Sequence, residues 1–133
     1  EKLGVPLGNR TGGVPQPDSS ESRFSGRSIE DVRDSVRGVE EVCFGADVED
    51  AQSLVRYLEG IGRDDLGPAL REAFDASYAA LDQIPEPLTE AVMTDPAAVQ
   101  AAEDALGEVQ RLIQVDVIAA MGLMLTFTDA DGD

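Results

Sequence analysis

Apolar side chains recur at helical spacing soon after residue 27, and this pattern predicts the first helix. The recurring residues are Ile29, Val32, Val36, Val39 and Cys43, separated by 3, 4, 3 and 4 positions. Such spacing places all five side chains on one face of an α-helix. We therefore expect a helix from Ser28 to about Gly45, a residue typical of helix ends. Cys43 should be a core residue, since no cationic neighbour would lower the pKa of its thiol.

Three further segments show the same helical spacing. The second predicted helix runs from about Val48 to Ile61. The third starts near Asp64 and reaches Leu88, but two prolines, at positions 85 and 87, predict a kink or a short break near Ile84. The fourth starts at the pair Asp95-Pro96, an N-cap acid followed by a proline at the first helical position, and its pattern can continue through Met121.

Residues 1–27 contain five glycines and three prolines and lack a sustained apolar period. We expect an irregular N-terminal arm there, without helix or strand, that acts as a linker and not as a core element. Residues 28–133 then form the folded unit. Four amphipathic segments with short connections favour an all-α fold, an antiparallel four-helix bundle preceded by the arm.

The charge and composition exclude several classes of function. The 133 residues include 27 acids and 10 bases, for a net charge of −17, with no His and one Cys. Nucleic acid is excluded as a partner because its phosphates would be repelled. Without His or a second Cys there is no imidazole base, histidine metal ligand or internal disulfide.

The ends of the chain show no targeting segment. The sequence opens on Glu1 without a signal peptide, and its longest nearly uncharged apolar run, Val117 to Phe127, is too short to span a membrane. We expect the chain to be a piece of a longer protein or a processed product.

Asp116 continues the apolar register of the fourth helix, where a carboxylate must be paired, hydrogen-bonded or protonated. It is a candidate ligand-binding residue. The alternative is a structural ion pair with an arginine such as Arg33 or Arg71, or an exposed helix face.

Two other groups of polar residues are candidate sites. Asp129, Asp131 and Asp133 alternate as at the start of a calcium loop, although the glycine and glutamate that complete such a loop are missing and a solvated acidic tail is the alternative. A second group precedes the first helix and could hold an anion or a polar ligand at its N-terminus, or simply cap it. Its members are Glu21, Ser22, Ser25 and Ser28, and Asp31 completes a capping-box pattern with Ser28.

Three stretches resemble the imelysin family of bacterial envelope proteins. Glu1-Lys-Leu-Gly-Val-Pro-Leu-Gly8 is similar to the segment joining the two helical halves of that family. Glu21-Ser-Arg-Phe-Ser25 with Ser28-Ile-Glu-Asp31 resembles the entry to its second half. Ala120-Met-Gly-Leu-Met-Leu-Thr-Phe127 with Asp131-Gly-Asp133 resembles its ending, although Arg23, Cys43 and Met121 depart from the usual residues.

The resemblance implies that this chain is the second, C-terminal half of a periplasmic, secreted or lipid-anchored protein, with the N-terminal half as its partner. It further implies a ligand site between the halves, with Glu21, Ser25, Ser28, Asp31 and Asp116 as candidates on this side. A binding role in iron uptake or regulation is the leading hypothesis. No cofactor is expected in this chain alone, while the whole protein could hold iron or another divalent metal.

Two other functions remain open. The family includes an insulin-cleaving protease, so the whole protein could be a metallopeptidase whose Gly-x-His-x-x-Glu motif lies on the first half, since this chain has no His. The chain alone is expected to be inactive as an enzyme. The third possibility is a structural bundle that docks a partner through its acidic faces.

The net charge of −17 leads to a prediction about salt. The acid excess reflects either a saline habitat or a GC-rich genome. In the first case, molar potassium chloride should raise the melting temperature above its value in dilute buffer, because screening relieves repulsion in the compact state. A melting curve that salt leaves unchanged would favour the second origin.

Overall fold

The computed structural model describes residues 2–20, 26–45 and 53–122, and the regular elements in these ranges are helices. The predicted all-α class is thus confirmed. The elements are α1 Gly4–Leu7, the 3₁₀ turn η1 Pro17–Ser19, α2 Ser28–Phe44, α3 Leu54–Gly60, α4 Leu66–Asp82, α5 Leu88–Thr94, α6 Pro96–Arg111, the π-helical segment η2 Leu112–Val117 and α7 Ile118–Ala120.

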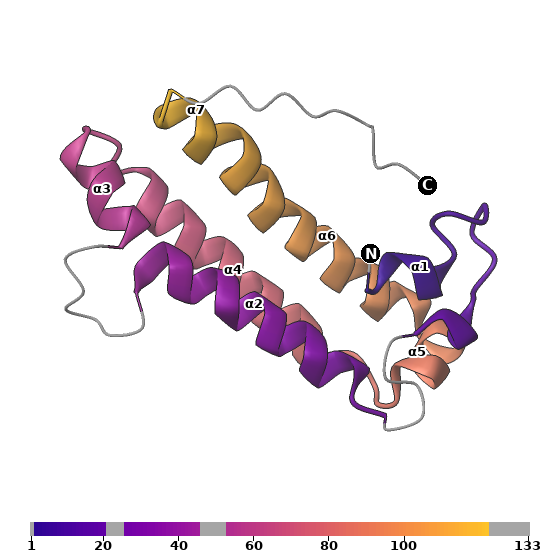
Figure 1. Cartoon of the computed structure of the whole chain (residues 1–133). Coiled ribbons are helices and arrows are strands. Elements are labelled where there is room, and N and C mark those ends of the chain that lie inside the picture. The colour runs from indigo at the N-terminus through magenta and orange to yellow at the C-terminus, as the bar shows by residue number, and fades with distance from the viewer. Residues whose placement is uncertain (1, 21–25, 46–52, 123–133) are drawn as a thin grey trace, which may run out of the picture.

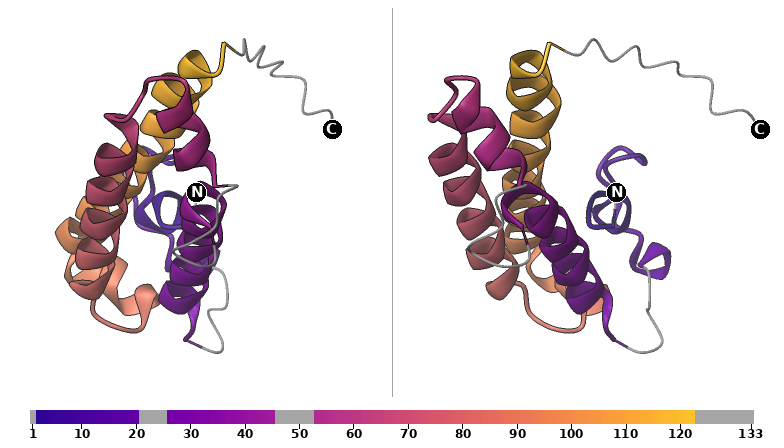
Figure 2. Two further views of the ribbon diagram at one scale, coloured as in Figure 1. Left: turned by 90° about the vertical axis from the view of Figure 1, so that its left-hand side faces the viewer. Right: turned by 60° about the vertical axis from the view of Figure 1, so that its left-hand side comes forward.

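Helix α4 contacts both α2 and α6 and runs antiparallel to both (Figures 1 and 2). The short helix α3 joins the end of α2 to the start of α4, and α5 lies at the opposite end, between α4 and α6 (Figure 1). The antiparallel four-helix bundle stays a prediction. In the described ranges, only α2, α4 and α6 are longer than seven residues.

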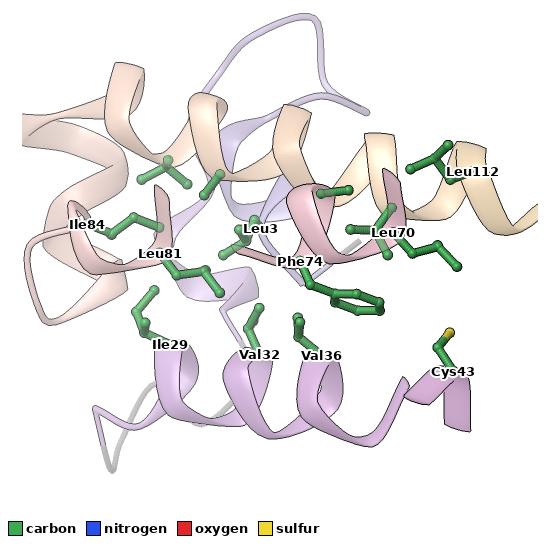
Figure 3. Close-up of a cluster of buried hydrophobic side chains, with 14 of the residues drawn as sticks. Leu3, Ile29, Val32, Val36, Cys43, Leu70, Phe74, Leu81, Ile84 and Leu112 are labelled. Atoms are coloured by element: carbon green, nitrogen blue, oxygen red, sulfur yellow. The ribbon is translucent and has the colours of Figure 1, made fainter. Parts of the chain in front are cut away.

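The core forms where α2 and α6 pack on α4 (Figure 3). The predicted residues of the first helix are confirmed as core, including Cys43 at 1% exposure, with the exception of Val39, which is 43% exposed. Leu70 and Phe74 of α4 are fully buried, as is Val99 of α6. These side chains bury the apolar faces that the spacing predicted.

The starts and ends of the later helices follow from capping and proline. The Asp95 side chain accepts a hydrogen bond from the backbone N–H of Ala98 at 3.1 Å, so the predicted N-cap of α6 is confirmed. The predicted break near Ile84 is also confirmed, because α4 ends at Asp82 and α5 begins as a separate helix. The first part of the second predicted helix, 48–52, lies outside the described residues.

The prediction that the N-terminal arm contains no helix and no core residue was wrong for part of it, since residues 4–7 form the helical turn α1 and Pro17–Ser19 form the 3₁₀ turn η1. Leu3 is 1% exposed and Leu7 is 7% exposed, and α1 contacts α5 and α6. The N–H of Leu7 bonds to the carbonyl of Leu3 at 3.1 Å, which brings both side chains to one face. A single turn is too short to show an apolar period, so this part of the core could not be read from spacing.

Gly8 ends α1 in the left-handed conformation, with φ of +90°. A Cβ at this position would lie 2.2 Å from the carbonyl oxygen of Val14, so both the dihedral angle and the close backbone approach require glycine. Gly12 also has a positive φ, of +69°, but a Cβ there would have no neighbour within 4 Å. Substitution of Gly12 would therefore test backbone strain alone, whereas substitution of Gly8 would test strain and a steric clash together.

Gly8→Ala should lower the free energy of unfolding by roughly 2 kcal/mol or more, because strain and a backbone clash act together. Gly12→Ala, the matched control, should cost about 1 kcal/mol from strain alone. Urea denaturation followed by circular dichroism measures both. Equal losses would mean that the contact between Gly8 and Val14 is unimportant.

Candidate functional site

A groove of about 390 Å³ lies between α2 and α6. Buried or partly buried side chains form its floor, among them Phe74 of α4, Val36 of α2 and Val109 of α6. Leu3, which precedes α1, also lines the groove. Because α2 and α6 both rest on α4, the space between them remains open.

The walls of this groove carry few charges. Ser35 and Val39 line it from α2, while Leu106 and Gln110 line it from α6. The charged residues among the described lining are Lys2 and Glu103. In a chain with 28% charged residues, such a surface favours an apolar ligand or segment over an ion.

The α1 end of the groove is polar and tightly packed. The Nζ of Lys2 donates a hydrogen bond to the Oγ of Ser35 at 3.2 Å, and that hydroxyl donates to the carbonyl oxygen of Asp31 at 2.8 Å. On the other side, a Cβ added to Gly4 would lie 2.6 Å from the Oε1 of Glu103. The N-terminal segment therefore touches both α2 and α6.

Ser28 and Asp31 lie in the first turn of α2, while Glu21 and Ser25 lie outside the described residues. Ser28 is 5% exposed and Asp31 is partly buried. The predicted capping box is wrong by one position, because α2 begins at Ser28 with Arg27 as its N-cap. The carbonyl of Arg27 accepts the hydrogen bond from the N–H of Asp31 at 2.9 Å.

Asp116 occupies the π-helical segment η2 and pairs with Arg111 of the same helix, with 2.9 Å between Oδ2 and Nη1. The predicted burial on the apolar stripe was wrong: the side chain is 33% exposed, and Val117 is buried instead. The wider π turn rotates the register by about one residue, so positions i and i+5 become neighbours. The alternative of a structural ion pair for Asp116 is thus confirmed, but its partner is Arg111 and not Arg33 or Arg71.

The structure does not bring Asp116 together with the residues at the start of α2. Asp116 acts electrostatically on Arg63, which precedes α4, whereas Arg33 near the start of α2 pairs with Asp82 at the far end of α4. The 17 residues of α4 extend about 25 Å. Asp129, Asp131 and Asp133 lie outside the described residues. Within the described ranges, no three acidic or cysteine side chains are placed to share a metal ion.

One polar cluster between α2 and α4 was not predicted. Glu40 accepts a hydrogen bond from the hydroxyl of Tyr78 at 2.8 Å and forms an ion pair with Arg71. The Arg71 guanidinium lies 3.7 Å from the centre of the Phe44 ring, and Phe44 meets Phe74 edge-on at 6.2 Å. The spacing of Glu40 and Phe44 on one helix face was the available signal, but their partners depend on how the helices pack.

Burial raises the pKa of Tyr78, and its hydrogen bond to the Glu40 carboxylate raises it further, to about 12. Burial, followed by the charge of Glu40, also raises the pKa of the Cys43 thiol. At Arg111 the pKa is raised by Glu108 first and then by Asp116. These shifts hold Tyr78 and Cys43 neutral and Arg111 charged, as structural groups do.

These features define the class of the protein as an all-helical domain with a largely apolar groove between two of its long helices. The sequence pattern of the imelysin family matches residues 1–115, and the chain belongs to this family. No curated protein and no solved structure matches it. In the described part of the chain, every helix is too short or too polar to cross a membrane.

Tyr78→Phe should lower the free energy of unfolding by about 1 kcal/mol, because the Glu40 carboxylate loses a donor. The stabilisation from the neutral phenol should be fully present below pH 10 and be lost as pH rises from 10 to 12, since the folded pKa is the higher one. Tyr57→Phe is the matched control, at a side chain that is 54% exposed. Urea denaturation from pH 8 to 12 measures the free energy of unfolding of both variants. Equal losses in the two variants would contradict the prediction.

Proposed function

We propose that this chain is the C-terminal helical half of an imelysin-like bacterial envelope protein and serves as a binding component linked to iron uptake or regulation. The observation that carries the proposal is the family match over residues 1–115. The location that goes with it is periplasmic, secreted or lipid-anchored. The N-terminal half of the same protein would be its partner.

The residues of this chain favour a contribution to binding over a contribution to catalysis. It contains no His, so it cannot supply the Gly-x-His-x-x-Glu motif associated with metal in this family. Its one thiol, Cys43, is 1% exposed, and its raised pKa keeps it protonated. Neither an imidazole base nor an activated nucleophile is then provided by these residues.

The ligand would lie between the halves, next to the start of α2. Glu21, Ser25, Ser28 and Asp31 are the candidates there, supported by the placement of the last two in one helical turn. Helix N-termini favour negatively charged or polar ligands, while carboxylates favour hard cations such as ferric ions. Carboxylates next to a helix N-terminus would therefore suit a metal ion that is bound together with an anion.

The test compares this chain with the longer protein that would contain it. Calorimetric titration with ferric citrate should show binding by the longer protein, and Asp31→Asn should weaken that binding about tenfold or more, as loss of a ligand does. Asp75→Asn, at an exposed residue of α4, is the matched control. Unchanged binding in the Asp31 variant would contradict the proposed site.

The metallopeptidase alternative is tested with the same two proteins. Metal-dependent cleavage of unfolded peptides by the longer protein would favour that function over a binding role. This chain alone should cleave nothing, because it lacks a metal-activated water or nucleophile of its own. Cleavage by the pure chain, abolished by mutating its acidic residues, would overturn this expectation.

A further inference from the structure

The groove between α2 and α6 combines apolar walls with a polar end. Val39 of α2 is 43% exposed, and Leu106 and Ile113 of α6 are only partly buried. The charged residues of the described lining, Lys2 and Glu103, lie together at the α1 end, next to Ser35 and Gly4 respectively. Apolar walls with a few polar groups gathered at one place are typical of a binding site for a small molecule.

We propose that this groove binds one neutral, single-chain amphiphile, with its alkyl chain between α2 and α6 and a hydroxyl-bearing head beside Lys2 and Glu103. A monoacylglycerol is a molecule of this class. The proposal goes beyond the role in iron uptake or regulation and does not depend on it.

The dimensions of the groove fit a single alkyl chain. Its lining on α6 runs from Glu103 to Gln114, a length of about 16 Å at the rise of an α-helix. A volume of about 390 Å³ spread over that length gives a mean cross-section of about 24 Å². An α-helix with its side chains is about 10–12 Å across and needs roughly three times that area or more. A strand, about 4.8 Å wide and about 10 Å deep with its side chains, needs roughly twice that area.

The length of the groove also sets the size of the ligand. Carbon–carbon bonds of about 1.5 Å at angles of about 111° advance an extended chain by about 1.25 Å per bond. A chain of about twelve carbon atoms therefore reaches from the polar end of the groove to Gln114. Since every methylene removed from water contributes to binding, affinity should rise with chain length until the groove is filled.

The charges at the polar end favour a neutral head with hydroxyl groups. A hydroxyl both accepts and donates hydrogen bonds, so it suits an ammonium and a carboxylate in one site. An ammonium has three donors and a carboxylate about four acceptor positions, so Lys2 and Glu103 can serve a ligand in addition to their partners in the protein. A carboxylate head would be repelled by Glu103 and by the net charge of −17, while an ammonium head would be repelled by Lys2.

Calorimetric titration of the full chain with 1-dodecanoylglycerol, kept below the concentration at which it forms micelles, tests the proposal. It should bind at a single site per chain. Dodecanoate should bind about tenfold more weakly or worse, because its head is charged. 1-Hexanoylglycerol should bind about a hundredfold more weakly or worse, because half of the alkyl chain is missing. Absence of binding by 1-dodecanoylglycerol would mean that protein covers the groove, and it would overturn the proposal.

Two valines of α2 provide a matched pair of variants that locate the site. Val39 and Val42 are both exposed, at 43% and 71%, and of the two Val39 lines the groove. Val39→Asp should weaken binding of 1-dodecanoylglycerol about tenfold or more, because a carboxylate then faces the alkyl chain. Val42→Asp adds the same charge to the same helix and should leave the affinity unchanged.

Two helical glycines provide a second pair, which adds volume instead of charge. A Cβ at Gly107 of α6 or at Gly38 of α2 would have no atom of the described residues within 4 Å, so both positions should accept a methionine. Gly107 lines the groove, and Gly107→Met should weaken binding by occupying it, whereas Gly38→Met should not. Circular dichroism checks that each variant keeps its helices. Equal affinities within both pairs would place the binding elsewhere and overturn the proposal.

Discussion

The buried face of α4 is the constraint on which the rest of the structure depends. Phe74 is fully buried, meets Phe44 of α2 edge-on and lies beneath the groove that borders α6. Leu70 and Leu81 extend the same face along the helix at 0% and 1% exposure. Because α2 and α6 each pack on this face, their separation is set by α4. The groove follows directly from that arrangement.

Polar contacts between helices add alignment more than stability. Arg33 pairs with Asp82 near one end of α4, and Arg71 pairs with Glu40 toward the middle. Both pairs are partly exposed to solvent, where an ion pair contributes about 0–1 kcal/mol. With 10 cations against 27 acids, pairs between α2 and α4 also reduce local repulsion. The ion pairs fix the register of α2 and α4, while apolar packing holds the two helices together.

Much of the fold could be predicted because apolar spacing and capping are local properties. Ile29, Val32 and Val36 were predicted as core from their positions alone, and Asp95 from its place before Pro96. The turn around Leu3 escaped prediction because one turn carries no period. The elements were thus easier to foresee than their ends.

The candidate site was less predictable because it depends on how helices pack. Val39 continues the stripe of α2 in sequence, yet it is 43% exposed and lines the groove between α2 and α6. The pairing of Tyr78 with Glu40 likewise needs two helices in a given register. Neither feature can be read from one helix alone, because both depend on how that helix packs on its neighbours.

The π-helical segment decides how the acidic candidates compare. It places Arg111 beside Asp116, five residues apart, while Arg111 also binds Glu108. A cation that approached Asp116 would have to displace an arginine already held by two carboxylates. At the start of α2, Ser28 and Asp31 share the first turn of the helix. Asp116 is therefore a weaker candidate ligand than Asp31, and its ion pair with Arg111 joins the end of α6 to η2.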